Sequence, residues 1–200
     1  MPGHRALHER VTTALDTCVE SQGVDFKESS AWDAIKFKLI RTAMAMGNLR
    51  DGGVIVIGAS ERGATWDLGG ITPEHLGSYD VDETVDGINK YSSPPVSVNV
   101  VTVKYRNGNT FLVLEIREFD ETPFVCKKDG AAKSDLRRGM VCIRPPGVAQ
   151  TTEVRKAEDM QDLLNLAAEK RARRMIEAAQ RIGLSPGPSP KPFDEELEGL

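Results

Sequence analysis

The stretch of residues 48–61, NLRDGGVIVIGASE, constrains the fold of this chain more than any other segment. Its centre, residues 54–57, is an unbroken run of Val and Ile, which is typical of a strand buried on both faces. Gly52 and Gly53 stand directly before this run, and glycine readily allows a sharp reversal from a helix into a strand. Gly58 ends the run, so we expect the acidic end of the stretch in a loop at the carboxyl end of a central strand.

The segments around this stretch show both helix and strand patterns. Residues 24–27 alternate apolar and polar side chains, which predicts a strand with Val24 and Phe26 inward. A helix is expected from an N-cap at Ser30 to about residue 46, because apolar residues recur there at intervals of three and four. An Asn-Gly pair at 107–108, between two alternating runs, is a strong hairpin signal.

Together these patterns predict an α/β (α+β) fold with a mixed sheet of about five to six strands flanked by helices. Two further short strands are expected at 123–126 and 140–144, and a helix at 73–91. A helical pattern from about residue 152 to 181 predicts a long carboxyl-terminal helix. The expected organisation is an N-terminal helix at 1–18, a domain at 19–168, a basic helical extension at 169–182 and a disordered acidic tail at 183–200.

The composition is that of a soluble protein with its own core. The chain has 200 residues, of which 40% are hydrophobic and 28% charged. No apolar run has the length of a membrane span and the first residues contain no signal-peptide core, so we expect a cytoplasmic protein without a membrane partner. The three cysteines are far apart and have no histidine at zinc-ligand spacing, which argues against a disulfide framework or a zinc site.

The formal net charge of −4 is unevenly distributed along the chain. Residues 183–200 carry one lysine and four acidic residues, whereas residues 127–144 carry six basic and two acidic residues. A basic segment on a nearly neutral body permits nucleic-acid binding, although a solvated face gives the same pattern. Aromatic residues make up only 6% of the chain, so a base-stacking platform is not indicated, and contacts to phosphate are expected instead. The candidate contact residues are Lys27, Lys36, Lys38, Arg41, Lys127, Lys128, Arg137, Arg138 and Arg144.

In their order and spacing, these elements resemble the Schlafen-type (Alba-like) DNA-binding domain family. The resemblance covers roughly residues 19–164. It implies an α/β domain with a mixed sheet, and two activities: nucleic-acid binding, or metal-dependent cleavage of structured RNA of the tRNA or rRNA type. The features that carry it are Glu20, Val24-Asp25-Phe26-Lys27, Met46-Gly47-Asn48, the Gly52 to Gly58 strand, Asn107-Gly108 and Ile143-Arg144.

The endoribonuclease alternative rests on three carboxylates. By resemblance to the family these fall on Glu20, Asp25 and Glu61. Carboxylates of this kind hold Mg²⁺ or Mn²⁺ through oxygen, and the metal then activates water at a phosphate. Asp25 stands where the family usually has Glu, and Glu61 where it usually has Asp, so each carboxylate is displaced by about one methylene. The alternative for Asp25 is a surface ion pair with a neighbouring cation such as Lys27 or Arg41.

The sequence therefore leaves three functions open. A nucleic-acid-binding module, for DNA or RNA, leads, and a metal-dependent endoribonuclease is the alternative. Nucleotide binding by the turns at Gly52 and Gly58 is a third, although no P-loop sequence is present. Relatives with two such lobes form a groove between them, so a comparable groove in this chain requires a homodimer, for which the long carboxyl-terminal helix is the candidate contact.

Overall fold

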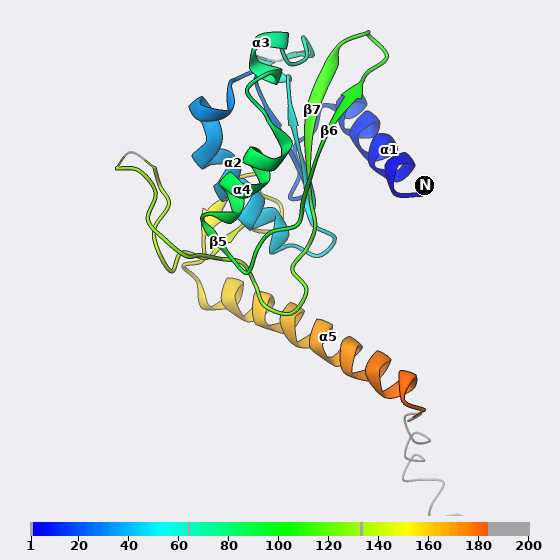
Figure 1. Ribbon diagram of the computed structural model, residues 1–200, viewed down its shortest axis with the longest axis vertical. Coiled ribbons are helices and arrows are strands. Elements are labelled where there is room, and N and C mark those ends of the chain that lie inside the picture. Colours follow the sequence, from blue (N-terminus) through cyan, green and yellow to red (C-terminus); the bar gives the residue numbers. More distant parts are fainter. Residues whose placement is uncertain (1, 64, 133, 184–200) are drawn as a thin grey trace, which may run out of the picture.

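A computed structural model describes residues 2–63, 65–132 and 134–183. Its centre is a four-stranded mixed sheet in which β1 pairs parallel with β2, and β2–β7 and β7–β6 pair antiparallel (Figure 1). The predicted hairpin is confirmed as the β6–β7 pair, and the strand at 24–27 is confirmed as β1 at the sheet edge. In sheet order, the strands are β1 Val24–Lys27, β2 Gly53–Ile57, β7 Thr110–Ile116 and β6 Val98–Lys104.

Helices cover both faces of this sheet. They are α1 Pro2–Thr17, α2 Trp32–Gly47 and α4 Val81–Asn89. α1 lies against one face and α2 with α4 against the other (Figure 1). Because consecutive strand residues point to opposite faces, Ile55 packs in the cluster formed with α2 and α4, whereas Val54, Val56 and Phe26 pack with α1. β2 is therefore buried on both faces, as the apolar run predicts.

The two glycine turns around β2 are sites of close packing. Gly52 has φ +61°, and a methyl group on it would overlap the carbonyl oxygen of Ile116. Gly58 has φ +119°, and a methyl group there would overlap the backbone between Gly70 and Ile71. Neither position therefore has room for a side chain, so glycine is required at both ends of β2.

The main sheet of the described residues has four strands, fewer than the five to six expected. The segments that were expected to extend the sheet lie in separate two-stranded ribbons. Each is a short run near Pro or Gly and pairs with another short strand rather than with the main sheet. One helix was expected across 73–91, but the chain forms two, α3 Pro73–Leu76 and α4. The ribbons are β3 Ser60–Arg62 with β4 Thr65–Asp67, β5 Ser92–Ser93 with β8 Val125–Cys126, and β9 Cys142–Ile143 with β10 Thr152–Glu153.

The carboxyl-terminal helix α5, Ala157–Arg181, is confirmed as a long helix. It packs on the body through Leu163, Leu166 and Ala167, and its second half projects past the body (Figure 1). No helix within the described ranges is both long and apolar enough to cross a bilayer. The expected acidic tail falls at 184–200, which lies outside the described residues.

Two predicted helix starts are corrected. The N-cap of α2 is Ala31, which makes no side-chain capping bond, rather than Ser30, whose carbonyl oxygen accepts a hydrogen bond from the Tyr79 hydroxyl. α5 begins at Ala157 rather than near residue 152, because residues 152–153 pair with β9 as strand β10.

Candidate nucleic-acid interface

Five of the sequence-predicted site residues surround one cavity of about 560 Å³. We call this cavity the α2 groove, because β1 and α2 form its two long sides. Glu20 precedes β1, Asp25 and Lys27 lie on β1, and Lys38 and Arg41 lie on α2. The fold thus brings the predicted signature strand and the predicted basic helix to one place. The remaining lining residues are Thr42, Asp135, Ala149, Gln150 and Thr151.

The α2 groove continues toward the basic loop, which we define as residues 127–139. A smaller cavity of about 190 Å³ shares Lys38, Arg41 and Asp135 with the groove. It reaches Phe37 on α2 and Leu136 on the basic loop. The loop therefore borders the depression beside α2 through Ser134, Asp135 and Leu136.

Asp25 is a buried carboxylate between two cations. It is 5% exposed, and its Oδ1 accepts a hydrogen bond of 2.9 Å from Nη1 of Arg144. Its Oδ2 is ion-paired with Nζ of Lys27, which also donates to the carbonyl oxygen of Phe26 at 3.1 Å. Asp25 therefore pairs with Lys27, as the alternative interpretation allowed, but it does so in the interior and together with Arg144.

Arg144 is also buried, which corrects its assignment as a phosphate contact. It is 1% exposed, so its guanidinium cannot reach a nucleic acid outside. The guanidinium links the chain after β9 to the edge strand β1. Its carbonyl and carboxylate partners there offset the cost of burying its charge. Its Nη2 donates to the carbonyl oxygens of Ser21, Val24 and Ala149 at 2.8, 3.3 and 2.6 Å.

The three predicted carboxylates do not fit one Mg²⁺ or Mn²⁺ ion. Asp25 is already neutralised by two cations, and Glu20 Oε1 accepts a hydrogen bond of 3.0 Å from the amide of Phe26. Glu61 is exposed on β3, where it faces Trp66 across a ribbon, and it does not line the α2 groove. Across residues 2–63, 65–132 and 134–183, no three His, Cys, Asp or Glu side chains form a group able to hold a metal.

The cations of the α2 groove differ in how free they are. Lys38 is exposed and has no acidic partner within the part of the chain that is described. Arg41 is partly buried, and its guanidinium donates to Asp135 Oδ2 at 3.4 Å and to the carbonyl oxygen of Thr151 at 3.2 Å. Lys36 lies outside the groove and pairs with Asp33 at 2.6 Å. Lys38 is therefore the groove cation most available to a phosphate.

The cations of the basic loop divide in the same way. Lys127 and Arg138 are exposed, without an acidic side-chain partner among the residues described, and line a second cavity of about 670 Å³ beside α5. Lys128 lies 4.5 Å from the centre of the Tyr91 ring. Arg137 pairs with Glu153 on β10 at 2.6 Å. Lys127 and Arg138 are thus two exposed cations of this loop without an acidic partner among the described residues.

The sequence interpretation missed the wall of the α2 groove formed by residues 149–151. These residues follow Pro145-Pro146-Gly147 and carry no local signal, because the buried guanidinium of Arg144 places them beside β1.

The thiol of Cys142, next to Arg41, is buried. Burial raises the pKa of Cys142 to about 12, although Arg41 acts to lower it, so this thiol stays protonated at neutral pH.

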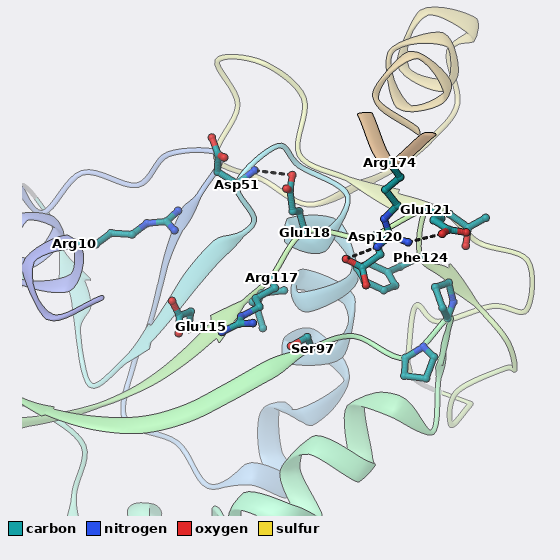
Figure 2. A pocket seen from close by; sticks show the side chains of 14 residues that line it. Arg10, Asp51, Ser97, Glu115, Arg117, Glu118, Asp120, Glu121, Phe124 and Arg174 are labelled. Carbon is teal, nitrogen blue, oxygen red and sulfur yellow. Dashed lines mark hydrogen bonds and ion pairs between the residues drawn. The ribbon is translucent and has the colours of Figure 1, made fainter. Parts of the chain in front are cut away.

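A separate cavity of about 710 Å³ lies beside the second half of α5, and none of the predicted site residues lines it (Figure 2). Nη2 of Arg174 lies 3.3 Å from Asp120 Oδ1, and Nη1 of Arg174 donates to Glu121. Lys170 pairs with Glu118 at 2.7 Å. We call these five residues the α5 anchor, because their pairs hold the helix to the loop after β7.

Hydrogen bonding determines the charge of Glu118 in the α5 anchor. Burial acts to raise the pKa of Glu118, but hydrogen bonds from Lys170 and from the amide of Asp51 outweigh it, so the pKa lies below its ordinary value. Figure 2 shows Glu118 directed toward Asp51, whose amide donates at 3.1 Å. This carboxylate is therefore ionised at neutral pH, as the anchor requires.

The model of the family described as "Schlafen, AlbA_2" matches residues 20–145, which is more than half of the chain. The chain belongs to the Schlafen, AlbA_2 family. The Schlafen, AlbA_2 segment includes both members of the Asp25–Arg144 pair, the groove cations and the whole basic loop. α1, β10 and α5 lie outside it.

Two solved structures are similar to this chain. The DIP2311 protein from Corynebacterium diphtheriae is 18% identical, with a TM-score of 0.46, and the match covers 68% of this chain and 23% of DIP2311. The N-terminal domain of a RecG-related protein from Nitrosomonas europaea is 19% identical, with a TM-score of 0.43, and the match covers 64% of this chain and 86% of that domain. A comparison with curated proteins finds no match.

Proposed function

We propose that this chain is a nucleic-acid-binding module that contacts the phosphate backbone through the α2 groove and the basic loop. The observation that carries the proposal is the convergence of Lys27, Lys38 and Arg41 on one groove that the basic loop borders. Phosphate contacts from lysine and arginine position a protein on nucleic acid and supply most of its non-specific affinity. Membership of the Schlafen, AlbA_2 family agrees with this function.

Inside the groove three cations face three carboxylates, and two of these carboxylates, Asp25 and Asp135, are paired with cations. Asp25, the most buried groove carboxylate, is neutralised by Arg144 and Lys27. Lys38 is exposed at the surface and has no acidic partner among the described residues. Because no aromatic ring lines the α2 groove itself, recognition relies on phosphate rather than on base stacking. The proposed binding is therefore tolerant of sequence and sensitive to salt, on DNA or on RNA.

Metal-dependent cleavage of RNA is the weaker alternative. Glu20 is the only groove carboxylate without a cationic partner in the described residues, since Asp25 pairs with Arg144 and Lys27 and Asp135 with Arg41. A metal ion would have to compete with these pairs. The groove residues are therefore assigned to binding.

The test measures binding of the full chain to labelled duplex DNA and to a folded RNA by fluorescence anisotropy. Lys38→Glu should weaken binding by about tenfold, because it replaces a phosphate contact by a repelling charge. Lys104→Glu is the matched control, since Lys104 is exposed on β6, at the opposite edge of the sheet from β1. Equal binding by both variants, with both folded, or no binding by the unaltered chain, would overturn the proposal.

A parallel set of reactions with Mn²⁺ or with EDTA addresses cleavage. Under the binding proposal the nucleic acid stays intact in both, and affinity does not depend on the metal. Cutting that requires Mn²⁺ and is lost in a folded Glu61→Ala variant would instead establish the nuclease, because Glu61 lies away from the groove and makes no ion pair in the part of the structure described.

A further inference from the structure

α5 is bound to the body along one face only. Leu163, Leu166 and Ala167 pack on the body, and Lys170 and Arg174 continue the same face through the α5 anchor, of which Figure 2 shows Arg174. These positions follow helical spacing, so they form one stripe along the helix. The second half extends past the body in Figure 1, and residues 171–178 are all exposed. The face opposite the anchor thus has no partner in the described part of the chain.

That opposite face is apolar. Its apolar positions succeed one another at intervals of four, four, three, four and three residues, close to the spacing of a coiled-coil seam. Leu164 is 52% exposed, Met175 73% and Ile182 74%, and Ile176 beside them is 51% exposed. Large apolar side chains gathered on one exposed face indicate an interaction surface. We call this face the α5 stripe, consisting of Leu164, Ala168, Ala172, Met175, Ala179 and Ile182.

The charges of α5 are opposite in the two halves of the helix. Residues 157–168 carry three acidic residues and no basic residue. Residues 169–181 carry five basic and two acidic residues, and two of the basic ones belong to the α5 anchor. The charged residues of α5 without an ion pair among the described residues are Glu158, Asp159, Asp162, Arg171, Arg173, Glu177 and Arg181.

We propose that the α5 stripe packs against the α5 stripe of a second copy of this chain, with the two helices antiparallel. An antiparallel pair places the acidic half of each helix beside the basic half of the other, whereas a parallel pair places like charges together. The helix is thus complementary to itself in one orientation, which identifies a second copy as the partner. This proposal is independent of the proposed nucleic-acid binding.

The first test is the mass of the full chain in solution, measured by light scattering over a range of concentrations. The unaltered chain should show twice the mass of one copy, and Met175→Glu with Ile182→Glu should raise the dimer dissociation constant by about tenfold or more. Val19→Glu with Val81→Glu is the matched control, because these residues are 62% and 50% exposed away from α5. A monomer at every concentration would overturn the proposal, as would equal effects of the two double variants. If removal of residues 184–200 converts a monomer into a dimer, that segment occupies the stripe and the proposal is wrong.

The second test is the orientation of the helices. In a Cys18→Ser background, chains with Leu164→Cys and chains with Ile182→Cys are mixed and oxidised; Cys126 and Cys142 are buried and remain. An antiparallel pair of α5 stripes brings residue 164 of one copy near residue 182 of the other, so mixed cross-links should predominate. Predominant 164–164 and 182–182 cross-links would show a parallel pair and overturn the proposed orientation. Helicity measured by circular dichroism establishes that each variant is folded.

Discussion

Asp25 lies between Arg144 and Lys27 and is 5% exposed. A buried charge of this kind persists only when it is paired and hydrogen-bonded, and here Arg144 Nη1 donates to Asp25 Oδ1. Arg144 also binds three carbonyl oxygens around the start of β1 and the segment after β9. The carboxylate therefore stabilises the groove wall, and its contribution at the residue scale is to the fold.

Replacing Asp25 by Ala should destabilise the protein by about 3–5 kcal/mol, because it leaves the Arg144 guanidinium buried without its anion. Urea unfolding measures the loss. Asp25→Leu with Arg144→Met should cost less than either single change, since the pair is then replaced by apolar groups. Glu20→Ala is the control, with a cost of about 1 kcal/mol for one hydrogen bond to the Phe26 amide. An Asp25→Ala protein as stable as the original would contradict the structural role.

Gly52 and Gly63 form a natural comparison, with φ of +61° and +65°. Gly63→Ala should cost about 1 kcal/mol for the left-handed backbone alone, because nothing lies near its added methyl group. Gly52→Ala should cost about 1–3 kcal/mol more, because its methyl group would overlap the carbonyl oxygen of Ile116. The two free energies of unfolding are compared in urea. Equal losses would show that the turn before β2 is not closely packed.

At the scale of elements, α5 depends on charge pairs that its first half does not need. The first half is buried against the body through leucine and alanine side chains, whereas the second half is held by Lys170 and Arg174. Charge pairs at a partly exposed surface are individually weak. The second half of α5 is therefore the part of the helix that a change of pH or salt concentration can loosen.

Acid should loosen the second half of α5 before the rest of the fold. The pKa of Glu118 is lowered in the folded protein, so its contribution is present above the ordinary value of 4.5 and is lost as pH falls through the lowered pKa. Hydrogen exchange of residues 170–181, corrected for the intrinsic effect of pH, measures this loosening. Glu118→Gln should give loosened exchange at neutral pH and a smaller further change in acid, because the pairs of Arg174 with Asp120 and Glu121 remain. A corrected exchange rate that does not change with pH in the original chain would contradict the role of the α5 anchor in holding the helix.

Elements defined by local pattern were predictable from the sequence. β2 follows from its apolar run between glycines, and the β6–β7 hairpin follows from Asn107-Gly108. The groove could be predicted only in part, because β1 and α2 are adjacent in sequence and carry Lys38 and Arg41, whereas Arg144 is 119 positions from Asp25. An arginine near a basic loop resembles a surface residue until its partners are known. The position of Glu61 was also unpredictable. After the turn at Gly58 the chain forms β3, which belongs to a separate ribbon and not to the main sheet.

For the whole molecule, the exposed predicted cations Lys38, Lys127 and Arg138 lie on a chain of net charge −4. The α2 groove and the basic loop lie next to each other. Lys104, the control residue, lies on β6 at the opposite edge of the sheet. Binding to phosphate through such a surface depends on position rather than on overall charge. In the dimer proposed above, two grooves on one assembly would bind a longer nucleic acid more tightly than one groove does.

The salt dependence of nucleic-acid binding tests the central claim most directly. The slope of log K against log salt concentration is measured for the original chain, for Lys38→Ala and for the control Lys104→Ala. Each phosphate contact contributes about 0.9 to the slope on duplex DNA, so Lys38→Ala should reduce its magnitude by about that amount and Lys104→Ala should leave it unchanged. Identical slopes for Lys38→Ala and the original chain, or binding that does not respond to salt, would contradict the assignment of the α2 groove as a phosphate-binding surface.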